Sequence, residues 1–479
     1  MSLSSALSSA MSGLTAAGRA SGVVSDNIAN VMTPGYSRRT LEVTSSTDTG
    51  PGVKIVGVHR HSDPVLVSER RSADSEYANA KLLADFHARF ESLVGAPTDS
   101  QSIGVHLAEF ESSLITAASN PDSTQRLDGV VHAATALSDA INTAASGLAQ
   151  MRSQADSSIS LQVERLNQAL QNVQKLNLRI TAALSSGSDT ASLLDQRQAM
   201  VDQINEIVPI NQADRDHGQI ALYTDGGAIL LDGQPATIAF SKANGVTPDM
   251  TIGNGGLSGL QINGIPASAR AIAGGTLAAN FEIRDSLAVS AQADLDAVAR
   301  DLIERFETAS LDPTVAPGSP GLFTDDGAAF DPLLEVGLAG RLGLNSVVDP
   351  AQGGESWRLR AGLGAASPGM PGEARLLQAF SGILSETRVP ATSVFGTGGT
   401  SAAGLSSRLM SRAAQHSHFA DQALSFATAS KTELTRMELA QGVDTDAELQ
   451  NLMIIEQAYA ANARMIEAVD EMMNTLLRL

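Results

Sequence analysis

The chain has 479 residues and a formal net charge of −20 at pH 7, and it contains no cysteine. The negative charge argues against nucleic acid or an anionic membrane surface as a partner, since both are bound by clustered Lys and Arg. The absence of cysteine excludes disulfides and thiolate metal sites, and the length allows about two to four domains. No apolar run reaches the roughly 18–20 residues that span a bilayer, and the N-terminus lacks the basic segment of a secretory signal.

The first apolar stripe predicts a long amphipathic helix from about Leu3 to Asn30. Its apolar positions recur at alternating steps of four and three residues, the pattern of a coiled coil. These positions are Leu3, Leu7, Ala10, Leu14, Ala17, Ser21, Val24, Ile28 and Val31. Thr33-Pro34-Gly35 is expected to end the helix, and 36–61 is expected to be extended because it is rich in β-branched residues.

The C-terminal segment carries a matching stripe, so the two ends of the chain both indicate helices that need a partner. Its positions are Leu452, Ile455, Tyr459, Asn462, Ile466, Val469, Met473 and Leu476. The stripes are buried against each other within one monomer, in a layer shared between subunits, or in both ways. Asn462 and Ser21 place polar groups in the stripes, and a buried Asn commonly fixes helix register.

The middle of the chain is predicted to be largely helical, beginning near Asp74. One face runs from Leu83 to Leu93 and another from Ile103 to Leu114, which Asn120-Pro121 ends. The longest stripe extends from Leu127 to Leu184. Shorter or later helices are expected over 193–207, 280–310, 405–440 and 444–479.

Two stretches have the composition of β-structure or loops. Short apolar runs between 211 and 275 are separated by Asp-Gly turns, which is typical of hairpins. The segment 311–404 is rich in Gly and Pro, and Trp357 lies in a strand-like sequence. The predicted fold is therefore mainly α with a β-rich insertion: an elongated, multidomain chain whose terminal helices pair as a coiled coil.

The predicted domains are nested and discontinuous. Residues 1–65 and 441–479 form an axial coiled-coil core. Residues 66–210, 276–310 and 405–440 form an α-helical rod, and 211–275 with 311–404 form a β-rich outer domain.

The sequence predicts no catalytic, cofactor-binding or metal site. The pairs His59/His61 and His416/His418 lack the further ligands of a recognised metal spacing, and Asp325-Asp326-Gly327 lacks the rest of a calcium loop. The glycines of 253–259 have the wrong spacing for a dinucleotide loop. These sequences are expected to be surface residues and turns.

The sequence Ser25-Asp-Asn-Ile-Ala-Asn30, followed by Thr33-Pro-Gly-Tyr-Ser-Arg38, resembles the N-terminal signature of bacterial flagellar axial proteins. Rod and hook proteins share the Asn-Ile-Ala-Asn core, and the Thr-Pro-Gly-Tyr-Ser-Arg continuation is similar to the hook-associated protein 1 (FlgK) family. Segments 442–444, 456–462 and 470–477 are similar to the C-terminal end of that family, and 110–127, 193–197 and 274–285 also fit. The axial motif residues are Asn27, Ile28, Ala29, Asn30, Thr33, Pro34, Gly35, Tyr36, Ser37 and Arg38.

The resemblance implies a structural, non-enzymatic protein of the hook–filament junction. Such proteins pass unfolded through the flagellar type III export apparatus without a cleaved signal and act outside the cell. They form a homo-oligomeric ring between the hook protein and hook-associated protein 3, and an export chaperone first holds their C-terminal helix. The chain is short for the family, so an outer domain found in some members is expected to be absent or reduced. Neither nucleic-acid binding nor membrane insertion is expected.

The resemblance also assigns roles to residues. Leu3, Leu7, Leu14, Val24 and Ile28 are expected to pack with the C-terminal stripe, and Asn27, Asn30, Pro34, Gly35 and Tyr36 to set the turn out of the core. Three alternatives remain: another axial protein of the hook or rod, a secreted enzyme with its activity in 311–404, or an adhesin built on the β-rich insertion. The long helix from Leu127 argues against a hook protein, which would be mostly β outside its ends.

Overall fold

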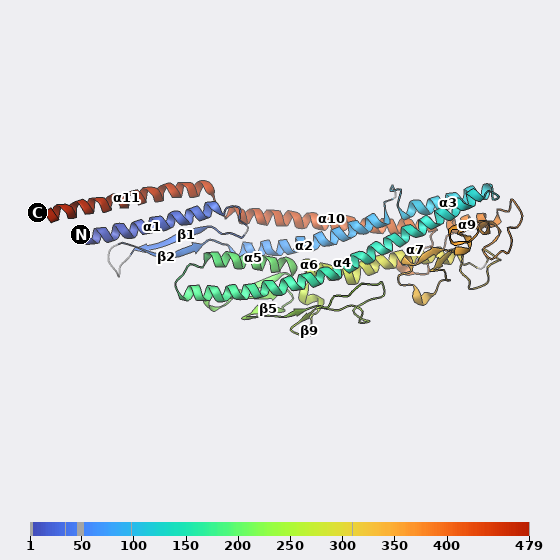
Figure 1. Cartoon of the computed structure of the whole chain (residues 1–479), viewed down its shortest axis with the longest axis horizontal. Helices are drawn as coiled ribbons and strands as arrows, with labels where there is room; N and C mark the ends of the chain where they lie inside the picture. Colours follow the sequence, from blue (N-terminus) through green and yellow to red (C-terminus); the bar gives the residue numbers. More distant parts are fainter. Residues whose placement is uncertain (1–2, 34, 46–51, 97, 309, 479) are drawn as a thin grey trace.

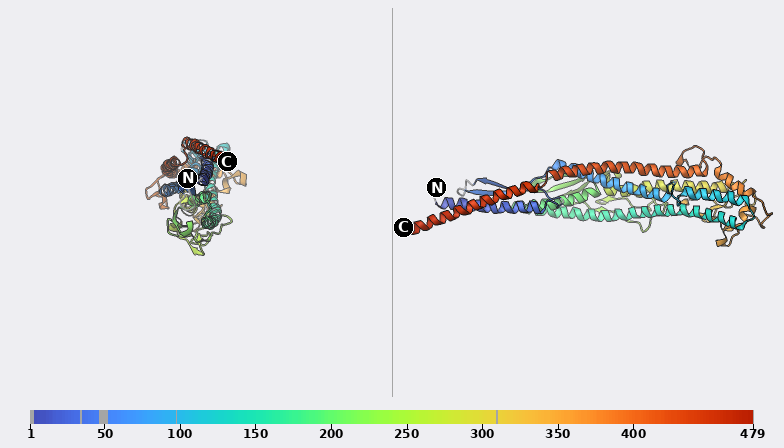
Figure 2. Two further views of the ribbon diagram at one scale, coloured as in Figure 1. Left: turned by 90° about the vertical axis from the view of Figure 1, so that its left-hand side faces the viewer. Right: turned by 90° about the horizontal axis from the view of Figure 1, so that it is seen from above.

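A computed structural model describes residues 3–33, 35–45, 52–96, 98–308 and 310–478. The molecule is long and narrow, and both ends of the chain lie together at one tip (Figure 1). There α1 (Leu3–Ala29) packs with α11 (Thr445–Arg478), and the view from above shows α11 crossing over α1 (Figure 2). The predicted pairing of the terminal helices is confirmed.

A hairpin follows α1 and lies beside it. Its strands β1 (Arg39–Ser45) and β2 (Val53–Arg60) are antiparallel, with an irregularity between Glu42 and Val43. The extended structure predicted for 36–61 is confirmed over these two strands, and 46–51 lie outside the described residues.

The next helix begins ten residues earlier than predicted. Helix α2 (Pro64–Val94) starts at Pro64 rather than near Asp74. The Asp63 side chain accepts hydrogen bonds from the amides of Val65 and Leu66, and proline is favoured in the first turn because it lacks an N–H. The prediction placed the start near Asp74 because the apolar stripe becomes regular only there, whereas the true start is indicated by Asp63-Pro64 alone.

The body of the molecule is a bundle of long helices. Helix α2 packs against α10 (Ala402–Ala440), and α3 (Ile103–Ser119) packs against α4 (Thr124–Ser185). The 62 residues of α4 correspond to about 93 Å, so this helix alone runs along most of the bundle (Figure 1). Helix α5 (Ala191–Ile207) turns back against α4, and these predicted helices are confirmed.

Two small sheets pack on the C-terminal half of α4. One has the order β3 (Ile210–Asp214), β4 (Ile220–Thr224), β5 (Ile229–Asp232) and β6 (Gln234–Pro235), and all its neighbours are antiparallel. The other joins β7 (Ile238–Ala239), β8 (Gln261–Ile262) and β9 (Ile265–Pro266). Their buried side chains form one core with α4 and α5, so the predicted hairpins are confirmed.

The helix predicted over 280–310 is longer at its start and is interrupted. It consists of α6 (Gly275–Glu282), a π-helical turn (Ile283–Leu287) and α7 (Ala288–Phe306). Within the turn, the fully buried Arg284 pairs with Asp156 of α4 at 2.7 Å and with Asp285 at 2.8 Å. A π-turn adds a residue to the helix, which is compatible with aiming this guanidinium at α4.

The segment 311–404 contains few strands. It holds β10 (Phe323–Asp325), β11 (Leu342–Leu344), α8 (Arg358–Ala361) and α9 (Arg375–Ser385). The strand predicted around Trp357 is wrong: Trp357 has helical backbone angles (φ −59°, ψ −21°) and lies in the turn that precedes α8. Gly- and Pro-rich sequence indicates turns without specifying whether they join strands or short helices, and here they join 3-10 turns. The 3-10 turns found in the described residues are Asp216–Gly218, Ala269–Ile272, Pro332–Leu334, Leu338–Gly340, Ser346–Val348, Pro350–Gln352 and Ser393–Phe395.

This segment packs into the core at the far end of the bundle. Phe323 meets Phe110 and Phe306 edge-on, and Phe380 meets Phe306 edge-on, with ring centroids 5.3–5.5 Å apart. They belong to one buried cluster, whereas the two sheets of 211–275 belong to another. The predicted division of the chain into domains stays a prediction.

Candidate assembly interface

The α1–α11 pair buries only a narrow seam. On α1 the buried apolar residues are Ala10, Ala17 and Val24, which recur at seven-residue steps. On α11 the buried residues are Val469 and, near its start, Glu448. The helices therefore meet through small side chains, which bury little apolar area.

The other predicted seam residues are only partly covered in the single chain. Leu3, Leu7, Leu14, Ile28, Leu452, Ile455, Asn462 and Ile466 are half-buried, and Tyr459, Met473 and Leu476 are exposed. Their part in self-assembly stays a prediction, because it concerns contacts with further chains.

Gly13 gives α11 room to approach α1. A Cβ atom at Gly13 would lie 2.8 Å from both Oδ1 and Nδ2 of Asn462, closer than real Cβ contacts. The Asn462 amide donates to the Ala458 carbonyl at 3.0 Å within its own helix. Asn462 is therefore hydrogen-bonded within its own helix, and a side chain at position 13 would require the Asn462 amide to move.

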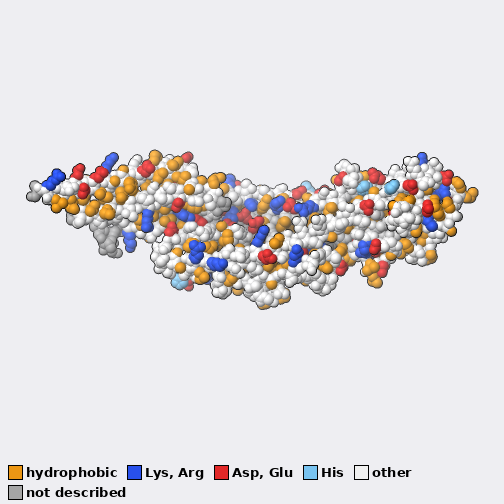
Figure 3. All heavy atoms as spheres, in the orientation of Figure 1, with side chains coloured by type: hydrophobic (Ala, Val, Ile, Leu, Met, Phe, Trp, Pro, Cys, Tyr) orange, Lys and Arg blue, Asp and Glu red, His pale blue; other side chains and the backbone are white. Residues whose placement is uncertain are grey.

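Large apolar side chains remain exposed on α11. Figure 3 shows hydrophobic side chains gathered over the tip that α1 and α11 form. Those more than two-fifths exposed are Leu449, Met453, Ile454, Tyr459, Met465, Met472, Met473, Leu476 and Leu477. Large apolar side chains gathered on a surface in this way indicate an interaction site.

The turn out of α1 is built on Asn27, which is fully buried. Its Oδ1 accepts hydrogen bonds from the Tyr36 hydroxyl at 2.8 Å and the Arg39 amide at 3.0 Å. Its Nδ2 donates to the Arg39 carbonyl at 2.8 Å. One amide side chain thus ties the end of α1 to the start of β1, and burial raises the pKa of Tyr36 to about 12.

The other motif residues have smaller structural parts. Asn30 is bonded to the Asp26 carbonyl and accepts from Thr33, and Gly35 has a φ of +78°, a conformation that favours glycine. Pro34 lies outside the described residues. The part that these residues play in setting the turn stays a prediction, to which the geometry of Asn27 gives a mechanism.

The turn is joined to α11 by an ion pair. Arg38 donates to Glu448 at 2.7 Å, and the Glu448 side chain is 2% exposed. The Asp444 carboxylate accepts from the amides of Asp446 and Ala447 and so caps the start of α11. The N-terminal motif and the Gly-Val-Asp sequence of 442–444 therefore act on the same junction.

A network of charged residues joins this tip to the helical body, and sequence reasoning missed it. Asp195 of α5 pairs with Arg39 at 2.5 Å and with Arg60 at 2.7 Å. Arg70 of α2 pairs with Asp202 of α5 and Glu438 of α10, both at 2.8 Å. The sequence indicated this network only through the segment 193–197, which contains Asp195 and is similar to the family. The spacing of charged residues does not show which of them pair.

The described residues contain no group of three or more metal-ligating side chains placed to hold an ion. None of the helices that they form combines the length and apolarity needed to cross a bilayer.

Three family profiles match the chain in succession. Residues 7–36 match "Flagella basal body rod protein", residues 88–321 match "Flagellar hook-associated protein FlgK helical domain", and residues 439–479 match "Flagellar basal body rod FlgEFG protein C-terminal". The chain belongs to the flagellar hook-associated protein FlgK family. The terminal matches fall on the α1–α11 tip, and the helical match covers α3 to α7 and part of α2.

Individual relatives agree with this family. The chain is 24% identical over 258 residues to "Flagellar hook-associated protein 1" of Escherichia coli K12, covering 52% of this chain and 47% of the relative. The protein of the same name from Salmonella typhimurium LT2 is 27% identical over 258 residues, covering 52% and 46%. That of Bacillus subtilis 168 is 23% identical over 240 residues, covering 47% of each. The chain thus spans about half the length of the relatives it matches.

A solved structure is also similar, that of the flagellar hook junction protein FlgK from Burkholderia pseudomallei. It shares 19% identity with a TM-score of 0.44, over 54% of this chain and 46% of the other. The family assignment rests on the sequence matches and not on this structural similarity.

Proposed function

We propose that this chain is a structural component of the flagellum that assembles on the distal end of the hook and connects it to the filament. The observation that carries the proposal is the α1–α11 tip, which bears both flagellar terminal motifs and presents an uncovered apolar face. A face that one monomer leaves exposed is available for burial by further copies of the chain.

The sequence of the helical body favours a junction protein over a hook or rod protein. The terminal motifs are common to axial proteins, whereas the match over 88–321 is to a FlgK helical domain. That family is a structural one, and the segment 311–404, once a candidate for an enzymatic activity, contributes Phe323 and Phe380 to the bundle core. No observation favours the adhesin alternative.

The proposal includes the partners that the resemblance implies. Copies of the chain form a ring between the hook protein and hook-associated protein 3, outside the cell. Before assembly an export chaperone covers the C-terminal helix, and the type III apparatus exports the chain. The exposed methionines of α11 support the proposal that a chaperone binds this helix, since flexible apolar side chains adapt to different partners.

The test is binding of the purified chain to the ends of isolated hooks, followed by electron microscopy with gold-labelled protein. Ile466→Asp places a charge in the half-buried seam of α11 and is expected to abolish binding while the helical body unfolds as in the wild type. The matched control is Ile115→Asp, which changes an isoleucine that is 57% exposed on α3, away from the tip.

Normal binding by Ile466→Asp would count against the seam. Binding along the hook rather than at its end would count against the junction. Equal loss in both variants would show a general effect of the added charge.

A further inference from the structure

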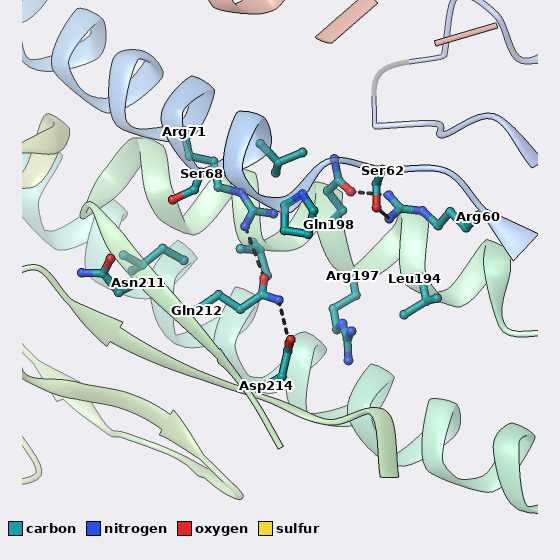
Figure 4. A pocket seen from close by; sticks show the side chains of 14 residues that line it. Arg60, Ser62, Ser68, Arg71, Leu194, Arg197, Gln198, Asn211, Gln212 and Asp214 are labelled. Atoms are coloured by element: carbon teal, nitrogen blue, oxygen red, sulfur yellow. Dashed lines mark hydrogen bonds between the residues drawn. The ribbon is translucent and has the colours of Figure 1, made fainter. Parts of the chain in front are cut away.

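A small cavity lies where the tip meets the helical body. It has a volume of about 240 Å³ and is enclosed by the end of β2, the start of α2, helix α5 and strand β3. Figure 4 shows side chains from all four elements around it. Three of them are arginines, Arg60, Arg71 and Arg197, and one is a carboxylate, Asp214.

Two of the arginines are neutralised by carboxylates on α5. Arg60 pairs with Asp195 at 2.7 Å, and Arg71 pairs with Asp202 at 2.6 Å. Both also donate to uncharged groups of the cavity wall: Arg60 to Ser62 and Gln198, and Arg71 to Gln212. These bonds hold the guanidinium groups in place around the cavity, and their charges are largely compensated.

Arg197 is different, because no carboxylate of the described residues lies within ion-pair distance of it. Its Nη1 donates to two neutral oxygens, Oδ1 of Asn177 at 2.9 Å and the carbonyl of Gly218 at 2.6 Å. Burial lowers the pKa of Arg197 to about 10, with Asp214 acting in the opposite direction. Partial burial of a guanidinium without a close counter-charge has a cost, and an anion bound beside it would offset that cost.

The remaining donors suit an oxyanion. Among the described residues, Nε and Nη2 of Arg197 and Nη2 of Arg71 have no hydrogen-bond acceptor. A guanidinium presents its donors in a planar fork that matches a carboxylate or phosphate. The cavity is reached from solvent past Ser68 and Asn211, which are exposed on its rim.

We propose that this cavity is a binding site for a carboxylate or another small oxyanion, with Arg197 as its principal ligand. The oxyanion can come from two sources: a free anion in solution, or an acidic side chain of a second copy of this chain, which carries a net charge of −20. The site itself does not depend on the proposed function; only the second source does.

The first experiment titrates inorganic phosphate into the full chain by isothermal titration calorimetry, with sodium chloride of equal ionic strength as the reference. Wild type is expected to bind phosphate saturably. Arg197→Gln should weaken binding at least about tenfold, because a charge-assisted hydrogen bond is lost. The matched control is Arg215→Gln, which removes an exposed arginine that follows β3, pairs with Asp232 of the same sheet and does not line the cavity, so binding should be unchanged.

A second variant covers the case in which Arg197→Gln fails to fold. Ser68→Asp places a carboxylate on the exposed rim, where it competes for the cavity and should also weaken phosphate binding. Ser68→Asn has the same shape without the charge and should bind as the wild type does.

Assembly assays separate the two sources. Lost phosphate binding with normal attachment to hook ends would identify a free oxyanion. Lost phosphate binding together with weakened self-association in Arg197→Gln and Ser68→Asp, but not in Ser68→Asn, would identify a carboxylate of a second copy. Absence of phosphate binding in the wild type, or equal binding in Arg197→Gln, would overturn the proposal.

Discussion

Replacing Asn27 by alanine tests how the axial motif holds the turn. The change removes three hydrogen bonds, to the Tyr36 hydroxyl and to the amide and carbonyl of Arg39, from a side chain that is fully buried. At a net value of about 1 kcal/mol for each bond, we expect the local free energy of opening to fall by about 3 kcal/mol. Water entering the vacated space would reduce this loss.

Hydrogen exchange of the backbone amides, followed by mass spectrometry, measures that local opening. A loss of about 3 kcal/mol corresponds to roughly 100-fold faster exchange over 36–45, provided that exchange there occurs by local opening. Tyr36→Phe removes only one of the three bonds and should accelerate exchange by roughly five- to tenfold. The helical body should be unchanged in both variants.

Asn30→Ala is the matched control. Asn30 belongs to the same motif, but its amide bonds to the Asp26 carbonyl of its own helix on the exposed side. Its replacement should change exchange over 36–45 by less than about threefold. Equal effects of Asn27→Ala and Asn30→Ala, or no effect of Asn27→Ala, would refute the role given to Asn27.

Three further predictions concern helix packing and pH. Gly18→Ala should stabilise α1 by about 0.5–1 kcal/mol because nothing lies within 4 Å of the new methyl group. Gly13→Ala should gain less stability or lose some, because Asn462 must move. Thermal unfolding followed by circular dichroism compares the two variants. Burial raises the pKa of Asp294 to about 6 from its ordinary value of 3.8, so the folded state binds the proton more tightly. This group therefore disfavours folding increasingly as pH rises through about 4 to 6, and urea unfolding should show that this part of the pH dependence is absent in Asp294→Asn. Burial and the stacked ring of His416, whose centroid is 5.5 Å from that of His87, lower the pKa of His87. The free energy of unfolding should therefore fall as pH drops below about 6.5. His416→Gln should reduce that fall, and an unchanged pH profile of stability would contradict the pairing.

Helices were the part of the fold most visible in the sequence. The alternation of three- and four-residue steps located α1, α4 and α11 because a helix that packs along one side must repeat its apolar residues at that interval. The start of α2 was missed because its signal is one cap, Asp63-Pro64, rather than a periodic pattern.

The segment around Trp357 could not be placed from its sequence. Glycine and proline show where the chain turns, but the conformation between turns is fixed by long-range contacts. The Asp312 carboxylate, for example, accepts from the amide of Leu363 at 2.7 Å, and Arg360 pairs with Asp122 at 3.1 Å. Such contacts join residues that no local pattern connects.

The candidate interface was predictable in outline only. The apolar stripes identified both helices of the tip, yet the residues buried at its centre, Ala10 and Ala17, are small and stand out little in a hydrophobic pattern. The ion pairs of Arg38 with Glu448 and of Asp195 with Arg39 and Arg60 join distant segments, so they depend on the folded arrangement.

The most direct test of the proposed function is a clean deletion of the gene that encodes this chain, with electron microscopy of the hooks and an assay for flagellin in the medium. The junction role predicts bare hooks and flagellin shed into the medium, both reversed when the wild-type gene is restored. Normal filaments attached to the hooks of the deletion strain would contradict it.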